Sequence, residues 1–311
     1  MDQIWIPLAV AAAFFQALRL AGLKVANQSI SVFAATLVRG LFGLPVMLAY
    51  LAAVVAYEAA GATNSLRIPE FNGRFLLMCL LSGLGQYFGT ALLVYAFQMR
   101  NFAVGTMLVK ADVIMTALIG SLLFSERISA SGWVAILVTV AGVLIVSAGR
   151  LDFAAMRRSG ESWGDLLLGY PTRICLVSAM IYATSYLTLR EALLAIEGSP
   201  MARSAWSAVG MTVLQLLVIG PWLLVRHRAD VMAIGRILPL AVAVGTASAL
   251  GTIFWFLATA YTNASYVAAV AQVQIAFTLA ISSLYFRERI MPLEIVGMAG
   301  VLAGIVLFRF A

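Results

Sequence analysis

The chain has 311 residues, of which 63% are hydrophobic and 11% are charged, and it carries a formal net charge of +7. Soluble domains are about half apolar and about a quarter charged, because a surface that faces water has to be hydrated. The composition therefore excludes a soluble enzyme, a secreted disulfide scaffold and a disordered chain, and it assigns the positive charge to contact with anionic lipid headgroups rather than with nucleic acid.

Apolar runs of about 20 residues, the length that crosses a hydrocarbon core, predict ten membrane-spanning helices. The runs cover residues 4–24, 32–57, 74–98, 102–124, 130–148, 170–195, 204–225, 233–260, 264–286 and 291–309. Several connectors are only a few residues long, so successive helices are expected to be antiparallel. The sequence predicts an all-α, multi-pass protein of the cell inner (plasma) membrane.

The second half of the chain repeats the first. When the sequence is shifted by 162 positions, residues 83–148 overlay residues 245–310 without a gap. The clearest match is a Phe-x-Glu-Arg-Ile block, which occupies residues 124–128 and again 286–290. Ala, Leu and Val match by chance in apolar helices, whereas polar, charged and glycine residues that match in one register indicate a true repeat.

The repeat divides the chain into two units of five helices. We expect a first unit over residues 1–149, a linker over 150–169 and a second unit over 170–311. Because five is an odd number, the second unit has to enter the membrane in the opposite direction. The predicted architecture is ten transmembrane helices in two inverted-topology repeats, which is typical of secondary transporters with a substrate site where the halves meet.

The two matching blocks resemble the EamA family of the drug/metabolite transporter superfamily. They read LLFSERISASGWVAILVTVAGVLIV at 122–146 and LYFRERIMPLEIVGMAGVLAGIVLF at 284–308. The resemblance implies a transporter, not an enzyme, that exports or exchanges amino acids, other small metabolites or drugs. It also implies that both termini are cytoplasmic, whereas most Lys and Arg residues of the predicted loops lie on the other face, which the positive-inside rule would make cytoplasmic.

Four ionisable residues lie well within the apolar runs of the predicted spans and in the same half of the bilayer: Arg19, Arg39, Lys110 and Asp112. A charged side chain at this depth costs at least ~2.5 kcal/mol and therefore usually faces a cavity or a partner. Three bases against one acid predict a basic vestibule that suits a carboxylate or phosphate group. Arg39 and Lys110 are expected to face the substrate.

Alternative structural explanations exist for the same four residues. Arg19 is close enough to the end of its helix to extend to the headgroups, and Arg39 could form an ion pair with Asp112. Lys110 and Asp112 are two positions apart on one helix, so their side chains point about 200° away from each other. We expect Asp112, with Arg19, to serve as a coupling carboxylate or as part of an ion pair.

Polar and aromatic residues extend the predicted substrate site. In the repeat register, Lys110 overlays Gln272 and Asp112 overlays Gln274, so polar groups recur at the same depths in both halves. Aromatic walls with a few polar groups suit a small amphiphilic ligand. The remaining candidates are Gln86 and Tyr87 on the third predicted helix, Tyr182 on the sixth, and Trp255 on the eighth, which is the repeat equivalent of the third. The alternative is that these side chains only join helices or face lipid.

The paired residues Glu126-Arg127 and Glu288-Arg289 lie at helix ends, beside tight turns, and are expected to have a structural role there. Ser129 is placed to cap the fifth helix.

The His and Cys residues do not cluster, so we predict no metal site and no cofactor. The predicted function is a secondary transporter that moves a small organic metabolite, with an amino acid or another carboxylate-bearing solute favoured, by alternating access. The predicted partners are this solute and membrane lipids, but no nucleic acid, and the protein is expected to be monomeric. A drug exporter of the same fold and a membrane enzyme acting on lipid are the alternatives; the enzyme is disfavoured because an inverted repeat places the two Glu-Arg pairs on opposite faces.

Overall fold

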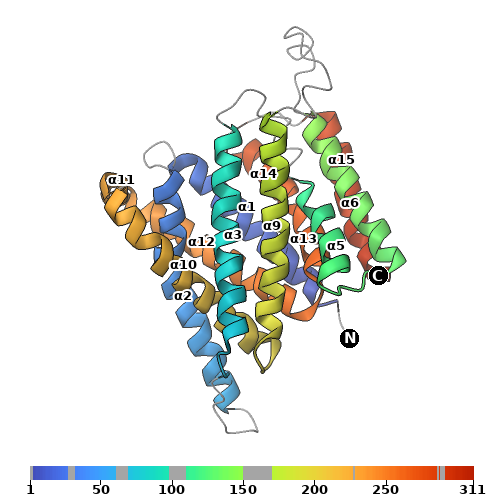
Figure 1. Cartoon of the computed structure of the whole chain (residues 1–311). Coiled ribbons are helices and arrows are strands. Elements are labelled where there is room, and N and C mark those ends of the chain that lie inside the picture. The colour runs from blue at the N-terminus through green and yellow to red at the C-terminus, as the bar shows by residue number, and fades with distance from the viewer. Residues whose placement is uncertain are drawn as a thin grey trace.

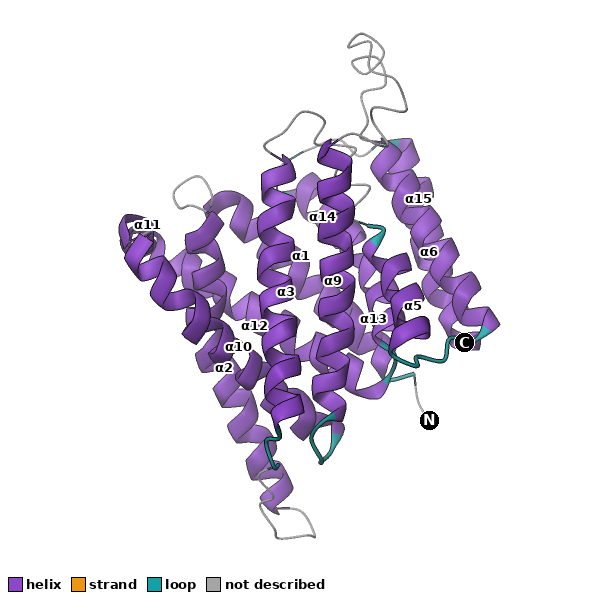
Figure 2. Ribbon diagram, in the orientation of Figure 1, coloured by secondary structure: helices purple, strands orange, loops and turns teal. Residues whose placement is uncertain are grey.

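The computed structural model describes residues 3–26, 32–60, 69–97, 110–149, 170–226, 228–285, 287 and 291–311. These residues form a bundle of helices with no strand among them (Figures 1 and 2). The predicted linker, 150–169, lies outside the described residues, as do Glu288 and Arg289.

The first half contributes five described helices, which are α1 (Trp5–Ala26), α2 (Val32–Ala60), α3 (Gly73–Phe97), α5 (Asp112–Leu123) and α6 (Ala130–Gly149). The second half contributes α9 (Tyr170–Leu194), α10 (Pro200–Arg226), α11 (Arg228–Ala233), α12 (Leu238–Tyr261), α13 (Ala264–Val270), α14 (Gln274–Leu284) and α15 (Pro292–Leu307). Short 3₁₀ turns cover Ile234–Ile237, Ala271–Val273 and Phe308–Phe310.

The ten predicted spans agree with these helices. Nine spans in the described part of the chain are long and apolar enough to cross a membrane, and α13 and α14 together form one of them. The fourth predicted span is described only from Lys110 onward, as a turn followed by α5. The prediction of an all-helical, multi-pass membrane protein is confirmed.

The chain begins and ends on the same face of the bundle, at the lower right in Figure 1. The Gln3 side chain donates a hydrogen bond of 2.8 Å to the carbonyl of Arg309. We call this face the termini face. A chain that starts and ends on one face has crossed the membrane an even number of times, which agrees with the ten predicted spans and with a second half that runs in the opposite direction to the first.

The pairing of helices has the symmetry of an inverted repeat. The third helix of each half packs against the first helix of the other, as α3 with α9 and α12 with α1. The second helices, α2 and α10, pack together, and so do the fifth helices, α6 and α15. Exchanging the two halves therefore leaves these helix pairs unchanged, as a pseudo-two-fold axis requires.

The fifth helices approach each other closely enough for their backbones to touch. A Cβ atom on Gly142 would lie 2.5 Å from the backbone nitrogen of Val301, and one on Gly304 would lie 2.8 Å from the backbone nitrogen of Thr139. Gly142 and Gly304 are equivalent in the repeat. Small residues allow such close packing between membrane helices, where van der Waals contact stabilises the pair.

One residue after α5 and its repeat equivalent after α14 have the same unusual φ angle. Ser125 and Arg287 are equivalent in the repeat, and their φ angles of 55° and 57° both lie in the left-handed region. After the first turn, the Ser129 hydroxyl accepts a hydrogen bond of 2.9 Å from the backbone N–H of Gly132. The prediction that Ser129 caps the fifth helix is confirmed.

Candidate functional site

A short 3₁₀ turn lies within the fourth helix of the second half, and the described part of the fourth helix of the first half begins at the equivalent position. In the second half, the 3₁₀ turn Ala271–Val273 separates α13 from α14, which begins at Gln274. In the first half, Lys110 and Ala111 form a turn, and α5 begins at Asp112. Asp112 and Gln274 are equivalent in the repeat, so α5 and α14 start at equivalent positions. Interrupted helices at the interface of inverted repeats are where transporters bind their substrates and ions.

The side chains of Arg19 and Arg39 lie near each other although they come from α1 and α2. The two guanidinium groups are close enough for electrostatic repulsion. Arg39 donates a hydrogen bond of 2.7 Å to the side-chain oxygen of Gln86. In the described part of the chain Arg39 therefore pairs with Gln86 and not with Asp112, which removes the ion-pair alternative for this arginine.

Two tyrosines of α9 lie beside these arginines. Tyr182 and Tyr186 are one helical turn apart, their rings stack with centroids 6.2 Å apart, and both are neighbours of Arg19 and Arg39. The Tyr182 hydroxyl is 2.7 Å from the hydroxyl of Thr90 on α3. A side chain at the position of Gly89 would place its Cβ 3.1 Å from the Tyr182 ring, so this glycine leaves the room that the ring occupies.

Tyr186 also reaches the acidic side of the site. Its ring packs against Trp255 of α12, with centroids 5.1 Å apart. The carboxylate of Asp112 interacts with the hydroxyl of Tyr186 and with the ammonium group of Lys110. One carboxylate oxygen of Asp112 is buried with no hydrogen-bond partner in the described structure.

Buried polar atoms without hydrogen-bond partners include Nε of Arg19 and the Asp112 oxygen, and, in the 3₁₀ turn of the second half, the side-chain oxygen of Gln272. Leaving a buried donor or acceptor unpaired costs about 1–3 kcal/mol, so such atoms call for a ligand, an ion or water. We call the group formed by Arg19, Arg39, Gln86, Asp112, Tyr182 and Tyr186 the central polar cluster.

Not every residue predicted for the site joins this cluster. Tyr87 packs with Phe42 and Leu84 against a separate apolar group. Gln274 is half-buried, at the start of α14. Lys110 and Trp255 border the cluster through Asp112 and Tyr186. Thr90 was missed, because a threonine in an apolar helix also fits a hydrogen bond to its own backbone, which Thr90 makes as well.

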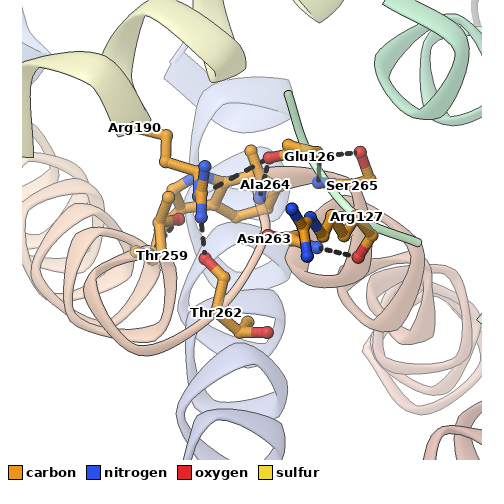
Figure 3. Close-up of polar contacts among 9 residues, drawn as sticks. Glu126, Arg127, Arg190, Thr259, Thr262, Asn263, Ala264 and Ser265 are labelled. Atoms are coloured by element: carbon orange, nitrogen blue, oxygen red, sulfur yellow. Dashed lines mark hydrogen bonds and ion pairs between the residues drawn. The ribbon is translucent and has the colours of Figure 1, made fainter. Parts of the chain in front are cut away.

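A second polar group surrounds Glu126 at the termini face (Figure 3). The Glu126 carboxylate accepts a hydrogen bond of 2.7 Å from the backbone N–H of Ala264 and a shorter one from the Ser265 hydroxyl. Nε of Arg190 lies 3.6 Å from the same carboxylate and donates to the carbonyl of Thr262. The carbonyl of Arg127 accepts a hydrogen bond of 3.0 Å from the Asn263 side chain.

The sequence does not reveal these partners of Glu126. Arg190 and Ser265 belong to the second half, far along the chain, and no local spacing relates them to the Glu-Arg pair. Gly120 leaves room for the carboxylate, since a Cβ there would lie 2.7 Å from Oε2 of Glu126.

This chain is similar to a known protein family, to a described relative and to a solved structure. The profile of the EamA-like transporter family matches residues 3–148 and, separately, residues 172–310. A Sinorhizobium protein described as an uncharacterized transporter in the cobO 3' region is 32% identical over 150 residues, which is 47% of this chain and 99% of that protein. One solved crystal structure shares the fold with a TM-score of 0.68 at 13% identity, over 100% of this chain and 98% of the other.

Proposed function

The chain belongs to the EamA-like transporter family, and we propose that it moves a carboxylate-bearing organic solute, with an amino acid favoured, across the inner membrane by alternating access. The family places the chain among transporters of small molecules. The nature of the solute and the direction of transport are argued from the central polar cluster.

The observation that carries the proposal is the pair of neighbouring arginines. Arg19 and Arg39 repel each other, and neither forms a salt bridge with a carboxylate in the described part of the chain. Two like charges held together within a membrane bundle are stabilised by an anion that binds between them. Arginine binds carboxylates through paired, charge-assisted hydrogen bonds, which makes a substrate carboxylate a fitting partner.

The other side of the cluster suits an amino group. Asp112 has a carboxylate oxygen without a hydrogen-bond partner, and Tyr186 is a neighbour of both this carboxylate and the arginines. An α-amino acid carries both charges on adjacent groups, so it would satisfy the arginines and Asp112 together. The rings of Tyr186 and Trp255 would then contact its side chain.

Export or exchange of such a solute fits this site better than export of cationic drugs. The cluster and its border hold three bases, Arg19, Arg39 and Lys110, and one acid, Asp112. A cationic compound would meet net repulsion there, because the interaction between charges is strong in a medium of low dielectric constant.

The test begins with metabolomics of cells and medium, with the gene deleted and overexpressed. The solute that changes most is then assayed as radiolabelled counterflow in proteoliposomes. We expect saturable counterflow of a carboxylate-bearing solute, reduced at least about tenfold in the double variant Arg39→Gln/Lys110→Gln, a loss of ~1.4 kcal/mol or more in binding. Unchanged counterflow of an anionic solute in the double variant would contradict the proposed charge recognition.

A further inference from the structure

Glu126 has an environment that substrate binding does not explain. Although it lies in the short loop after α5, its side chain is 0% exposed. The backbone N–H of Ala264, the hydroxyl of Ser265 and the guanidinium group of Arg190 all face its carboxylate. Glu126 belongs to the first half of the chain and all three partners belong to the second, so this one carboxylate joins the two repeats.

A buried carboxylate tolerates little separation from its partners. Its hydrogen bonds and its ion pair offset the cost of removing the charge from water, and that cost returns when the partners leave. If the halves moved apart at this face, Glu126 would lose the N-terminus of α13 and Arg190 together. The contact therefore stabilises the arrangement in which the halves meet.

An aromatic layer lies beside the carboxylate and also joins the two halves. Tyr266, in the first turn of α13, accepts a hydrogen bond of 3.1 Å from the backbone N–H of Ser129. Its ring packs against Trp5 and Phe308, with centroids 6.0 and 5.1 Å away, and these two rings also contact each other at 5.7 Å. All three rings are buried, so the termini face is closed here by apolar contact as well as by the ion pair.

Residues one turn further along α9 and α12 connect the central polar cluster with the surroundings of Glu126. Arg190 follows Tyr186 by one turn of α9, and Thr259 follows Trp255 by one turn of α12. Thr259 is 3% exposed, and its hydroxyl donates to the carbonyl of Trp255. A solute that left the cluster toward the termini face would pass Thr259 and meet the Arg190–Glu126 pair.

We propose that Glu126, held by Arg190 and Ser265, is the latch that keeps the termini face closed, and that it releases when the central polar cluster opens to that face. The inference rests on the proposed alternating access. It assigns a gating role to the Glu-Arg pair of the first half, for which the sequence alone indicates only a structural turn.

The test uses a single cysteine behind the latch. Thr259→Cys is introduced into the full chain after the buried residues Cys79 and Cys175 are replaced by alanine. A membrane-impermeant maleimide is added to sealed vesicles, and a tag at the C-terminus reports which side carries the termini face. Glu126→Gln keeps the shape of the side chain and removes its charge. We expect the rate of labelling from the termini face to rise at least about tenfold in this variant.

The matched control is Glu191→Gln, the residue next to Arg190. Glu191 forms an ion pair with Arg74 that also joins the two halves at this face, but the Arg74 side chain is 65% exposed. Exposed ion pairs contribute little to stability, so the rate of labelling should change by less than about twofold.

A milder variant keeps the test decisive if Glu126→Gln does not fold. Ser265→Ala removes one donor to the carboxylate and is expected to raise labelling about threefold, the effect of losing one hydrogen bond. Labelling that stays at the parent rate in folded, monodisperse protein, or that rises equally from both faces, would overturn the latch. Because labelling requires no substrate, this result is independent of the transport assay.

Discussion

Asp112 is the acidic residue of the central polar cluster, and it is the first residue of α5. Its charged and titratable neighbours are Lys110, Tyr182 and Tyr186, and both tyrosines are in turn neighbours of Arg19 and Arg39. A carboxylate in this position can bind a proton and a substrate ammonium group in turn, which would couple transport to a proton gradient.

We predict that Asp112→Asn abolishes stimulation of uptake by a pH gradient in proteoliposomes, whereas exchange without a gradient continues. The amide has the shape of the carboxylate and cannot carry the proton. Glu70→Gln changes an exposed acid in the connector just before α3 and serves as the control. A gradient response in Asp112→Asn equal to that of the parent protein would exclude Asp112 as the coupling group.

Gln86 positions Arg39 through the hydrogen bond of 2.7 Å between them. We predict that Gln86→Leu, which keeps the volume and removes the acceptor, raises the KM for an anionic solute by about tenfold or more, since a hydrogen bond to a charged group contributes about 1.5 kcal/mol or more. Counterflow over a range of concentrations measures the effect. Gln215→Leu on α10, whose amide binds the carbonyl of Gly83, is the control and should leave KM unchanged.

Single residues also show how far sequence reasoning reaches. Arg19, Arg39 and Asp112 could be selected because ionisable groups are rare in apolar runs and costly there. The partner of Arg39 could not be selected: Gln86 is one of several polar residues at suitable depth, and only packing decides between it and Asp112. For the same reason the sequence does not relate Arg190 to Glu126.

The elements of the fold are more predictable than their side-chain contacts. Long apolar runs determine where helices span the membrane, and the repeat register determines which helices are equivalent. The 3₁₀ turn before α14 was not predicted, since Ala271–Val273 contains no proline or glycine. Gln272 and Gln274, which match Lys110 and Asp112 in the repeat, marked its position without revealing the turn.

Close contact between α6 and α15 gives a prediction about stability. We expect Gly304→Ala to lower the midpoint of thermal unfolding by about 2–8 °C, because a new methyl group 2.8 Å from the backbone of Thr139 forces the helices apart at a cost of about 1–3 kcal/mol. Gly220→Ala in α10, where a Cβ meets nothing within 4 Å, is the matched control and should be neutral or stabilising.

Scanning fluorimetry in detergent measures both variants under identical conditions. Equal midpoints for the two variants would mean that the α6–α15 contact relaxes without cost and does not hold the fifth helices together.

For the whole molecule, the inverted symmetry of the helix pairs places the central polar cluster between two halves that can rearrange relative to each other. Glu126 and Tyr266 hold these halves together at the termini face, while Arg19 and Arg39 provide the charge that an anionic solute needs. In this proposal, recognition of the solute and closure of the termini face depend on different residues.

Recognition of a carboxylate by the paired arginines is the central claim, and one comparison tests it most directly. Counterflow of the identified carboxylate solute and of its neutral amide is measured in proteoliposomes that contain the parent protein, Arg19→Gln/Arg39→Gln, or the exposed control Arg74→Gln. The account predicts that the parent and the control prefer the carboxylate by at least about tenfold and that the double variant loses this preference. An unchanged preference in the folded double variant would contradict the account.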